Sequence, residues 1–433
     1  MVKKIRWSTG IAAALVVALA GSATAAVTWG NKNPIPLGYS WNYSNSLDFT
    51  GAPGTASFKL HDAFISDAKV PNGPEAAYYT SSRNGTTWAK PKKVSGKDHA
   101  EGSSLGAAGD TVVVGWFTGF SFYDPEGTPR VFQVNFSTDA GATWRGVQNL
   151  TPRTQNVDYP IVAAAKTSGG PVNLYGVWTD ADTGKVKFRM KSGGGAWSAP
   201  IVLGSTSASD NTGMFGYANI AATDDLITVA WIADNSGTLK ARAIDLNGNA
   251  NAAKTVSNWT AITTLNDKIS MAQNGYPIVS ASPLVKNKIT IAYNTNVAQK
   301  YTTFNGTAIA KAGKVIWNNG TLGGRTYTGG YSTVAEPAPG GGIVASWGAC
   351  KDTASDCNYN KNTARFDLLA STSGNGTDFT APKLLANSDA ANSTLNDEPS
   401  IVVVPGKVYL QYNGYTASYS SYDIFSIVGT GNA

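Results

Sequence analysis

Ser137-Thr138-Asp139-Ala140-Gly141-Ala142-Thr143-Trp144 is the stretch that decides the fold of this 433-residue chain. Ser81-Ser82-Arg83-Asn84-Gly85-Thr86-Thr87-Trp88 keeps its serine, glycine, threonine and tryptophan. Gly194–Trp197 and Gly376–Phe379 keep the glycine and the closing aromatic residue. A motif that recurs at intervals of tens of residues indicates a fold built from stacked copies of one supersecondary unit.

A second marker recurs in phase with the first. Single residues that precede an apolar run are spaced by 58 to 62 positions: Glu101, Tyr159, Tyr217, Tyr276, Glu336 and Glu398. Each run is rich in β-branched and aromatic residues and is followed by a Gly/Pro turn and a second run, as in Pro399–Val404 and Lys407–Tyr412. This pattern predicts two antiparallel strands per unit. A third strand, the motif and a fourth strand complete the unit.

The two ends of the chain indicate how the units are joined. The last unit stops after Asp423–Val428, where a motif and a fourth strand are expected. Thr28-Trp29 with Pro34–Leu37 matches the missing piece, so we expect the N-terminal strand to join the last unit and close a ring. The sequence therefore predicts an all-β, seven-bladed β-propeller, with six blades as the alternative.

This combination resembles the Asp-box, or bacterial neuraminidase repeat, propellers of the sialidase superfamily, over nearly all of the chain after residue 26. The resemblance implies that one set of residues forms a structural turn between the third and fourth strands of a blade, away from the active site: Ser137, Asp139, Gly141, Thr143 and Trp144.

One feature of that superfamily is missing. Sialidases are known for an arginine cluster and for an early Phe/Tyr-Arg-Ile-Pro motif, but this chain has no arginine between Arg6 and Arg83. The positions that correspond to the motif's arginine hold Asp158, Gly275, Ala335 and Asp397. Standard sialidase chemistry is therefore not predicted.

Residues 1–26 are predicted to be a signal peptide, with Lys3, Lys4 and Arg6 before an apolar run and small residues at its end. We expect export, to the extracellular space or the periplasm, with no membrane anchor after cleavage and with residues 27–433 as one propeller domain. The net charge of the whole chain is +6, and the segment carries three of the basic residues. A charge this small, without a basic run, does not predict nucleic-acid binding.

Cys350 and Cys357 are the two cysteines of the chain. After export, a disulfide between them is the expected state, and it would close a short loop of the sixth blade.

The face at which the innermost strands begin also carries the loops that join the second and third strands. We call it the mouth face, because ligands of propellers use such concave openings. Carboxylates and aromatic rings there suit sugars, whose hydroxyls need acceptors and whose C–H faces stack on rings. The candidate ligand-binding residues are Tyr159, Tyr217, Tyr276, Arg130, Arg153 and Arg325.

The candidate catalytic residues are His99, Glu101, Glu336 and Glu398. Asp98-His99-Ala100-Glu101 places carboxylates on both sides of a histidine, as the proton-abstracting base of a polysaccharide lyase would require. Glu336 or Glu398 could activate a tyrosine in a hydrolase.

No cofactor and no metal site is predicted. Three functional classes remain open: a glycan-binding propeller without turnover, a carbohydrate-active hydrolase or lyase, and a scaffold that binds a protein partner.

Overall fold

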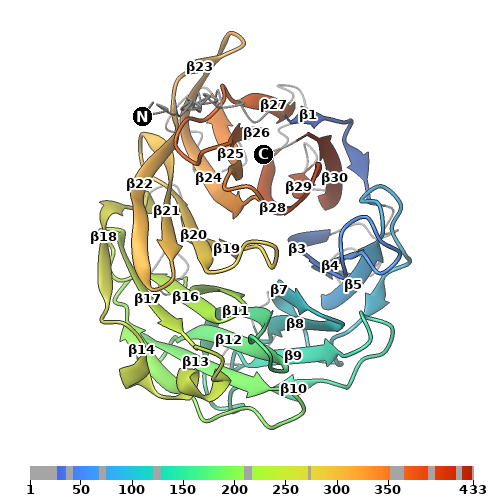
Figure 1. Ribbon diagram of the computed structural model, residues 1–433, viewed down its shortest axis with the longest axis vertical. Helices are drawn as coiled ribbons and strands as arrows, with labels where there is room; N and C mark the ends of the chain where they lie inside the picture. Colours follow the sequence, from blue (N-terminus) through green and yellow to red (C-terminus); the bar gives the residue numbers. More distant parts are fainter. Residues whose placement is uncertain are drawn as a thin grey trace, which may run out of the picture.

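Seven antiparallel sheets surround a central opening in the computed structural model (Figure 1). The structure describes residues 27–35, 42–67, 75–119, 128–208, 217–271, 275–351, 365–388, 395–415 and 422–431. The predicted seven-bladed propeller is confirmed, and the six-bladed alternative is wrong. The predicted signal peptide, residues 1–26, lies outside the described residues and stays a prediction.

Blades 1 to 3 follow one another along the chain, each with its innermost strand first. Blade 1 holds β3 (Asn42–Thr50), β4 (Lys59–Ser66), β5 (Ala76–Ser82) and β6 (Lys92–Lys93). Blade 2 holds β7 (Glu101–Ala108), β8 (Thr111–Phe117), β9 (Phe132–Ser137) and β10 (Gln148–Asn149). Blade 3 holds β11 (Val157–Lys166), β12 (Val172–Asp180), β13 (Lys185–Ser192) and β14 (Ile201–Ser205).

Blades 4 to 6 repeat the arrangement. Blade 4 holds β15 (Asn219–Thr223), β16 (Leu226–Ile232), β17 (Thr238–Asp245) and β18 (Thr263–Lys268), with the short 3₁₀ helices η1 (Ala250–Lys254) and η2 (Val256–Asn258). Blade 5 holds β19 (Ile278–Ala281), β20 (Lys288–Asn294), β21 (Ala298–Asn305) and β22 (Ala308–Asn318). Blade 6 holds β23 (Thr321–Leu322), β24 (Arg325–Pro337), β25 (Ile343–Lys351), β26 (Phe366–Ser373) and β27 (Lys383–Ala386).

Blade 7 joins the two ends of the chain. It holds β28 (Asn396–Val404), β29 (Lys407–Tyr415) and β30 (Tyr422–Thr430) together with β1 (Thr28–Trp29) and β2 (Asn33–Pro34). Trp29 pairs with Gly429, and Figure 1 shows the blue β1 beside the dark red β30. The predicted closure by the N-terminal strand is confirmed, and it covers an outer edge that would otherwise be unpaired.

The hydrophobic core consists of seven clusters, each between two neighbouring blades of the described structure. The second strand of every blade contributes at least one large aromatic residue that is at most 1% exposed, among them Phe64, Trp116, Trp178, Trp231, Tyr293, Trp347 and Tyr412. Because these rings pack against the preceding blade, the blades support one another around the whole ring.

Serine side chains cover the open edges of several innermost strands. The Oγ of Ser46 in blade 1 accepts a bond from Leu105 N in blade 2, at 3.1 Å. The Oγ of Ser104 in blade 2 accepts one from Val162 N in blade 3, also at 3.1 Å. Buried backbone N–H groups need such partners, so these serines link the innermost strands of blades 1, 2 and 3 to one another.

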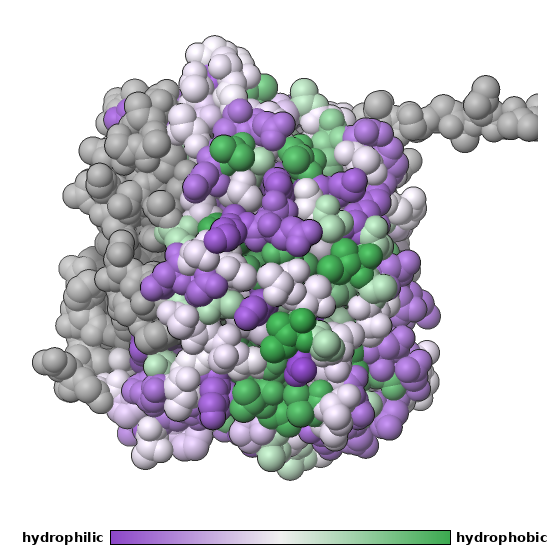
Figure 2. All heavy atoms as spheres, turned by 90° about the vertical axis from the view of Figure 1, so that its left-hand side faces the viewer, coloured by the Kyte–Doolittle hydropathy of each residue, from purple (hydrophilic) through white to green (hydrophobic). Residues whose placement is uncertain are grey.

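The outside of the ring mixes polar and apolar side chains. In Figure 2 hydrophobic residues form small separate groups among hydrophilic ones. The exposed large hydrophobic residues of the described ranges are Val147, Val202, Val256, Ile262, Leu284, Val297 and Val315. Scattered residues of this kind are ordinary on a protein surface. Within the same ranges no helix has the length and apolar character needed to cross a membrane.

The stretch Ser137–Trp144 forms the turn between β9 and β10, the third and fourth strands of blade 2. Ser137 Oγ accepts a bond from Gly141 N at 2.8 Å, and Asp139 Oδ1 accepts one from Thr143 N at 2.8 Å. Hydrogen bonds from Ser137 and Thr143 hold the pKa of Asp139 well below its usual range. Each polar side chain of the turn thus stabilises the turn itself.

The same bonding recurs in two other blades. In blade 1, Ser82 Oγ accepts from Gly85 N at 2.9 Å, and Asn84 Oδ1 accepts from Thr87 N at 2.8 Å. In blade 6, Ser373 Oγ accepts from Thr377 N at 3.0 Å, and Asn375 Oδ1 accepts from the same N–H at 2.8 Å. We call these three segments the repeat turns.

Each repeat turn is also bound to the preceding blade. Lys59 Nζ of blade 1 donates to Ala140 O in the turn of blade 2, at 2.7 Å. Lys311 Nζ of blade 5 donates to Gly376 O in the turn of blade 6, at 2.8 Å. Ser426 Oγ of blade 7 donates to Gly85 O in the turn of blade 1, at 2.8 Å. The repeat turns therefore hold neighbouring blades together.

Candidate functional site

A cavity of about 280 Å³ lies in the centre of the ring. All seven innermost strands line it, because each blade presents its first strand to the axis. Its walls include three of the predicted tyrosines and two of the predicted glutamates, Glu336 and Glu398.

Four tyrosines form a continuous row along this cavity, which we call the aromatic arc: Tyr159, Tyr217, Tyr276 and Tyr331. The ring centroids of neighbouring members lie 5.0, 5.5 and 5.7 Å apart in that order. The first three are partly exposed, and Tyr331 is buried. The structure thus brings together the three tyrosines that the sequence placed on successive blades.

Tyr276 remains a neutral phenol. Its Oη lies 2.9 Å from Ser332 Oγ in the next blade. Burial raises the pKa of Tyr276 well above its usual range, and the nearby Glu398 carboxylate raises it further. A tyrosine nucleophile would need the opposite shift, because activation lowers the pKa of a nucleophile.

Three carboxyl groups line the part of the cavity that the tyrosines do not line. We call them the channel carboxylates: Asp48, Glu336 and Glu398. Asp48 accepts bonds from Phe49 N and from Ala107 N of the next blade, both at 2.7 Å. Burial raises the pKa of Asp48 to about 7. Burial, and then the charge of Asp48, raise the pKa of Glu336 well above its usual range.

Glu398 is held differently from the other two. Its Oε2 accepts a bond from Asn413 Nδ2 of the neighbouring strand. The adjacent Asp397 is fully buried, and neither of its carboxyl oxygens has a hydrogen-bond partner among the described residues. Burial and the neighbouring Glu398 raise the pKa of Asp397 well above its usual range. One partly exposed carboxylate therefore lies beside one buried acid.

Bulges in the innermost strands orient the side chains that line the cavity. In blades 1, 2, 3, 6 and 7 the pairing of the first two strands shifts at the same register. Residues with positive φ follow in four of them: Gly102 (55°), Tyr159 (33°), Ser332 (51°) and Glu398 (47°). A bulge redirects a side chain, and positive φ at residues other than glycine is a strain that accumulates at functional sites.

The bulges also correct the repeat that the spacing predicted. Glu101 stands one residue before its bulge residue and is equivalent to Asp158 and Asp397, not to Tyr159. Glu336 lies five residues beyond Tyr331, deeper in the channel, at the register of Asp48. Asp48 was not among the predicted residues; the polar residue between Leu47 and Phe49 in an otherwise apolar strand was the available signal.

The three candidate arginines lie in separate ion pairs. Arg130 Nη1 is 2.6 Å from Asp158 Oδ1, and that aspartate is fully buried. Arg153 Nη2 is 2.9 Å from Asp98 Oδ2, and Arg325 Nη1 is 2.8 Å from Asp367 Oδ2. Each guanidinium therefore faces its own carboxylate, and the role of these arginines in ligand binding stays a prediction.

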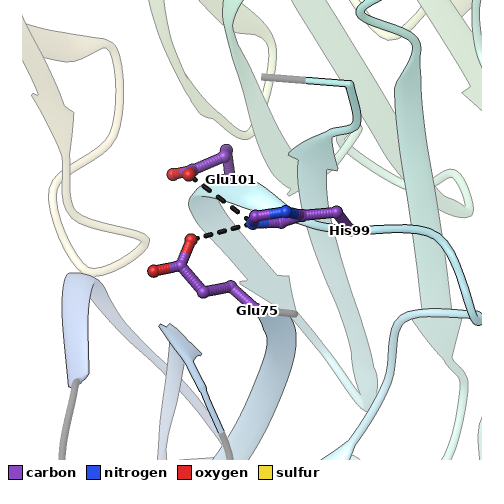
Figure 3. Close-up of side chains that lie close together, drawn as sticks. All are labelled: Glu75, His99 and Glu101. Carbon is purple, nitrogen blue, oxygen red and sulfur yellow. Dashed lines mark hydrogen bonds and ion pairs between the residues drawn. The ribbon is translucent and has the colours of Figure 1, made fainter. Parts of the chain in front are cut away.

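His99 lies at the junction of blades 1 and 2 with its Nε2 between two carboxylates (Figure 3). Glu75 Oε2 is 2.9 Å and Glu101 Oε1 is 3.6 Å from this nitrogen. The His99 side chain is 4% exposed. These contacts engage Nε2 alone, and the predicted role of His99 as a proton-abstracting base stays a prediction.

Cys350 is fully buried at the end of β25. Cys357 lies outside the described residues, so the predicted disulfide stays a prediction.

No protein-family model matches the chain, and no curated protein matches it. Solved structures do. The NanB sialidase of Streptococcus pneumoniae is similar over 94% of this chain and 70% of its own, with 8% identity and a TM-score of 0.47. A Trypanosoma rangeli sialidase is similar over 79% and 56%, with 12% identity and a TM-score of 0.41. A Penicillium chrysogenum α-L-arabinanase is similar over 75% and 92%, with 12% identity and a TM-score of 0.42. At these identities the likeness concerns the fold alone, so the assignment of function rests on the site itself.

Proposed function

We propose that this chain is an exported glycan-binding propeller, related to the Asp-box propellers, whose ligand lies in the mouth of the central channel. The observation that carries the proposal is the aromatic arc opposite the channel carboxylates in one cavity of about 280 Å³. This volume is close to the lower end of small-ligand pockets, roughly 300 Å³.

The two halves of the cavity match the two surfaces of a sugar. The partly exposed rings of Tyr159, Tyr217 and Tyr276 offer apolar faces on which C–H groups can stack. Glu398 offers carboxylate oxygens that accept hydrogen bonds from hydroxyl groups. The bulges at Tyr159 and Glu398 fix both kinds of side chain at the rim before a ligand arrives, which lowers the entropic cost of binding.

Binding without turnover agrees better with the electrostatics than hydrolysis does. Glycoside hydrolysis uses a protonated acid together with an ionised carboxylate at the scissile bond. Both oxygens of Asp48 accept backbone bonds, one from Phe49 N of the same strand and one from Ala107 N of the next blade, so its carboxyl group has a structural task. The raised pKa of Tyr276 disfavours a phenolate nucleophile.

A carbohydrate-active hydrolase is the second candidate, and one observation favours it. Glu398 lies close enough to Tyr276 for its charge to act on the phenol. A tyrosine nucleophile paired with a glutamate is known from sialidases, the superfamily that this chain resembles.

A glycan array probed with the full chain, followed by mass spectrometry of the ligands after overnight incubation, separates these functions. The proposal predicts saturable binding of a defined glycan that is recovered intact. Recovery of shortened glycan would establish the hydrolase. No glycan binding by a folded protein, together with a protein partner that sugars do not displace, would favour the scaffold and contradict the proposal.

Two variants of one tyrosine locate the binding. Tyr217→Ala removes the central ring of the arc, and Tyr217→Phe keeps the ring and removes only the hydroxyl group. If stacking carries the affinity, the alanine variant loses about 2 kcal/mol, or about 30-fold in Kd, and the phenylalanine variant stays within a fewfold of the wild type.

A further inference from the structure

We propose that Glu75, His99 and Glu101 form a binding site for a divalent transition metal, with Zn²⁺ the best match. The three side chains meet on the mouth face, outside the aromatic arc and the channel carboxylates (Figure 3). Their nearest donor atoms all lie within 4.8 Å of one another. This site neither requires nor supports the proposed glycan binding, so the two can fail separately.

The distances fit a metal ion. Zinc binds imidazole nitrogen and carboxylate oxygen at about 2.1 Å, which places the donor atoms of a tetrahedral site about 3.4 Å apart. The distances from His99 Nε2 to Glu75 Oε2 and Glu101 Oε1, 2.9 and 3.6 Å, lie on either side of that value.

The donor set fits as well. One imidazole and two carboxylates are ligands typical of Zn²⁺ and neighbouring first-row dications, whereas Ca²⁺ and Mg²⁺ prefer an all-oxygen shell. A protonated Nε2 has a single hydrogen to offer, although two carboxylates approach it. A dication on the same spot interacts with all three side chains at once and balances the two negative charges.

The backbone holds the three ligands in place. Glu75 immediately precedes β5 of blade 1, and Glu101 is the first residue of β7 in blade 2. Ala100 N donates to Glu75 O at 3.0 Å and ties the two segments together. The three side chains are between 4 and 18% exposed. Ligands on rigid, partly buried strand ends are preorganised for a metal.

Three protein ligands leave at least one coordination position for water or another ligand. Glu101 is followed directly by Gly102, which lines the central cavity. An ion in this site therefore lies at the rim of the channel mouth.

The site was not predictable from the sequence because Glu75 and His99 belong to different blades. His99 and Glu101 alone offer two ligands, and nothing in the residues around Glu75 indicates that it reaches His99.

The test measures Zn²⁺ bound to the full chain after removal of metals with a chelator and dialysis against Zn²⁺. Elemental analysis is expected to give one Zn²⁺ per chain, and calorimetry with Zn²⁺ alone is expected to give a micromolar or tighter Kd. Glu75→Gln, His99→Gln and Glu101→Gln should each weaken binding at least tenfold, since each removes one ligand. Asp98→Asn is the matched control, because this neighbouring carboxylate binds Arg153 instead.

Measurement of Tm with and without Zn²⁺ distinguishes a variant that has lost the metal site from a variant that does not fold. A ligand that binds only the native state raises Tm, so Zn²⁺ should raise the Tm of the wild type and of Asp98→Asn, and should raise that of a folded Glu75→Gln by less. Failure of the wild type to bind Zn²⁺, binding of Ca²⁺ in its place, or equal losses in Asp98→Asn and Glu101→Gln would overturn the proposal.

Discussion

The repeat turns and the channel mouth place similar polar residues in opposite situations. In the turn of blade 2 the side-chain oxygens of Ser137 and Asp139 all have hydrogen bonds, and the pKa of Asp139 falls. In the channel Glu336 is buried and Asp48 partly so, and the pKa values of both carboxyl groups rise. The turns stabilise the ring, whereas the burial of acidic groups in the mouth lowers the stability of the folded protein, a cost that is common at functional sites.

The largest expected effect comes from Gly141→Ala. Gly141 has φ of 80°, and a Cβ there would lie 2.1 Å from Tyr79 Oη. We expect the free energy of unfolding to fall by about 2 to 5 kcal/mol, measured by urea titration.

Gly146→Ala is the matched control for this change. Gly146 also has positive φ, 100°, but a Cβ there would have no neighbouring atom within 4 Å, so only backbone strain applies. We expect a loss of about 1 kcal/mol. Equal losses in the two variants would show that the contact with Tyr79 does not lock blade 2 onto blade 1.

Ser137→Ala should have a smaller effect. It leaves Gly141 N and Asp139 N without their acceptor in a fully buried position. Loss of such bonds costs about 1 to 3 kcal/mol. Thr138→Ala, at the exposed neighbouring position, should change the unfolding free energy by less than about 0.5 kcal/mol. A Ser137→Ala protein as stable as Thr138→Ala would contradict the role given to the turn.

The pH dependence of stability should differ in sign between the two regions. The pKa of Asp48 is raised to about 7 in the folded state, from about 3.9 in the unfolded chain. Between these values the folded state binds more protons, so this group lowers stability as pH rises from about 4 to 7. The lowered pKa of Asp139 acts in the opposite sense, because its contribution is present above the unfolded pKa and is lost in acid.

Asp48→Asn tests this sign. The variant loses one backbone bond and should be less stable than the wild type at pH 4, but it cannot ionise at this position, so the test compares how the unfolding free energy of each protein changes with pH. Urea titrations between pH 4 and 8 should show a smaller fall in unfolding free energy with rising pH than in the wild type. An unchanged slope would mean that Asp48 titrates normally.

The sequence could predict the turns and the ring but only part of the mouth. Ser137, Asp139 and Gly141 interact within eight residues, so their pattern is visible in the chain, and Thr28-Trp29 supplied the strand missing from the last unit. The contacts of Asp48 with Ala107 and of Glu75 with His99 cross from blade to blade. A count of spacings assumes units of equal length, but the residue of blade 6 that is equivalent to Tyr159 and Glu398 is Ser332, which is why the spacing puts Glu336 at the wrong register.

The most direct test of glycan binding in the channel mouth is a calorimetric titration of the best glycan from the array into the wild type, Tyr217→Ala and Ser137→Ala. We predict that Tyr217→Ala binds about 30-fold more weakly, and that Ser137→Ala, although less stable, binds within twofold of the wild type. Equal affinity of Tyr217→Ala and the wild type would contradict the placement of the ligand in the channel mouth.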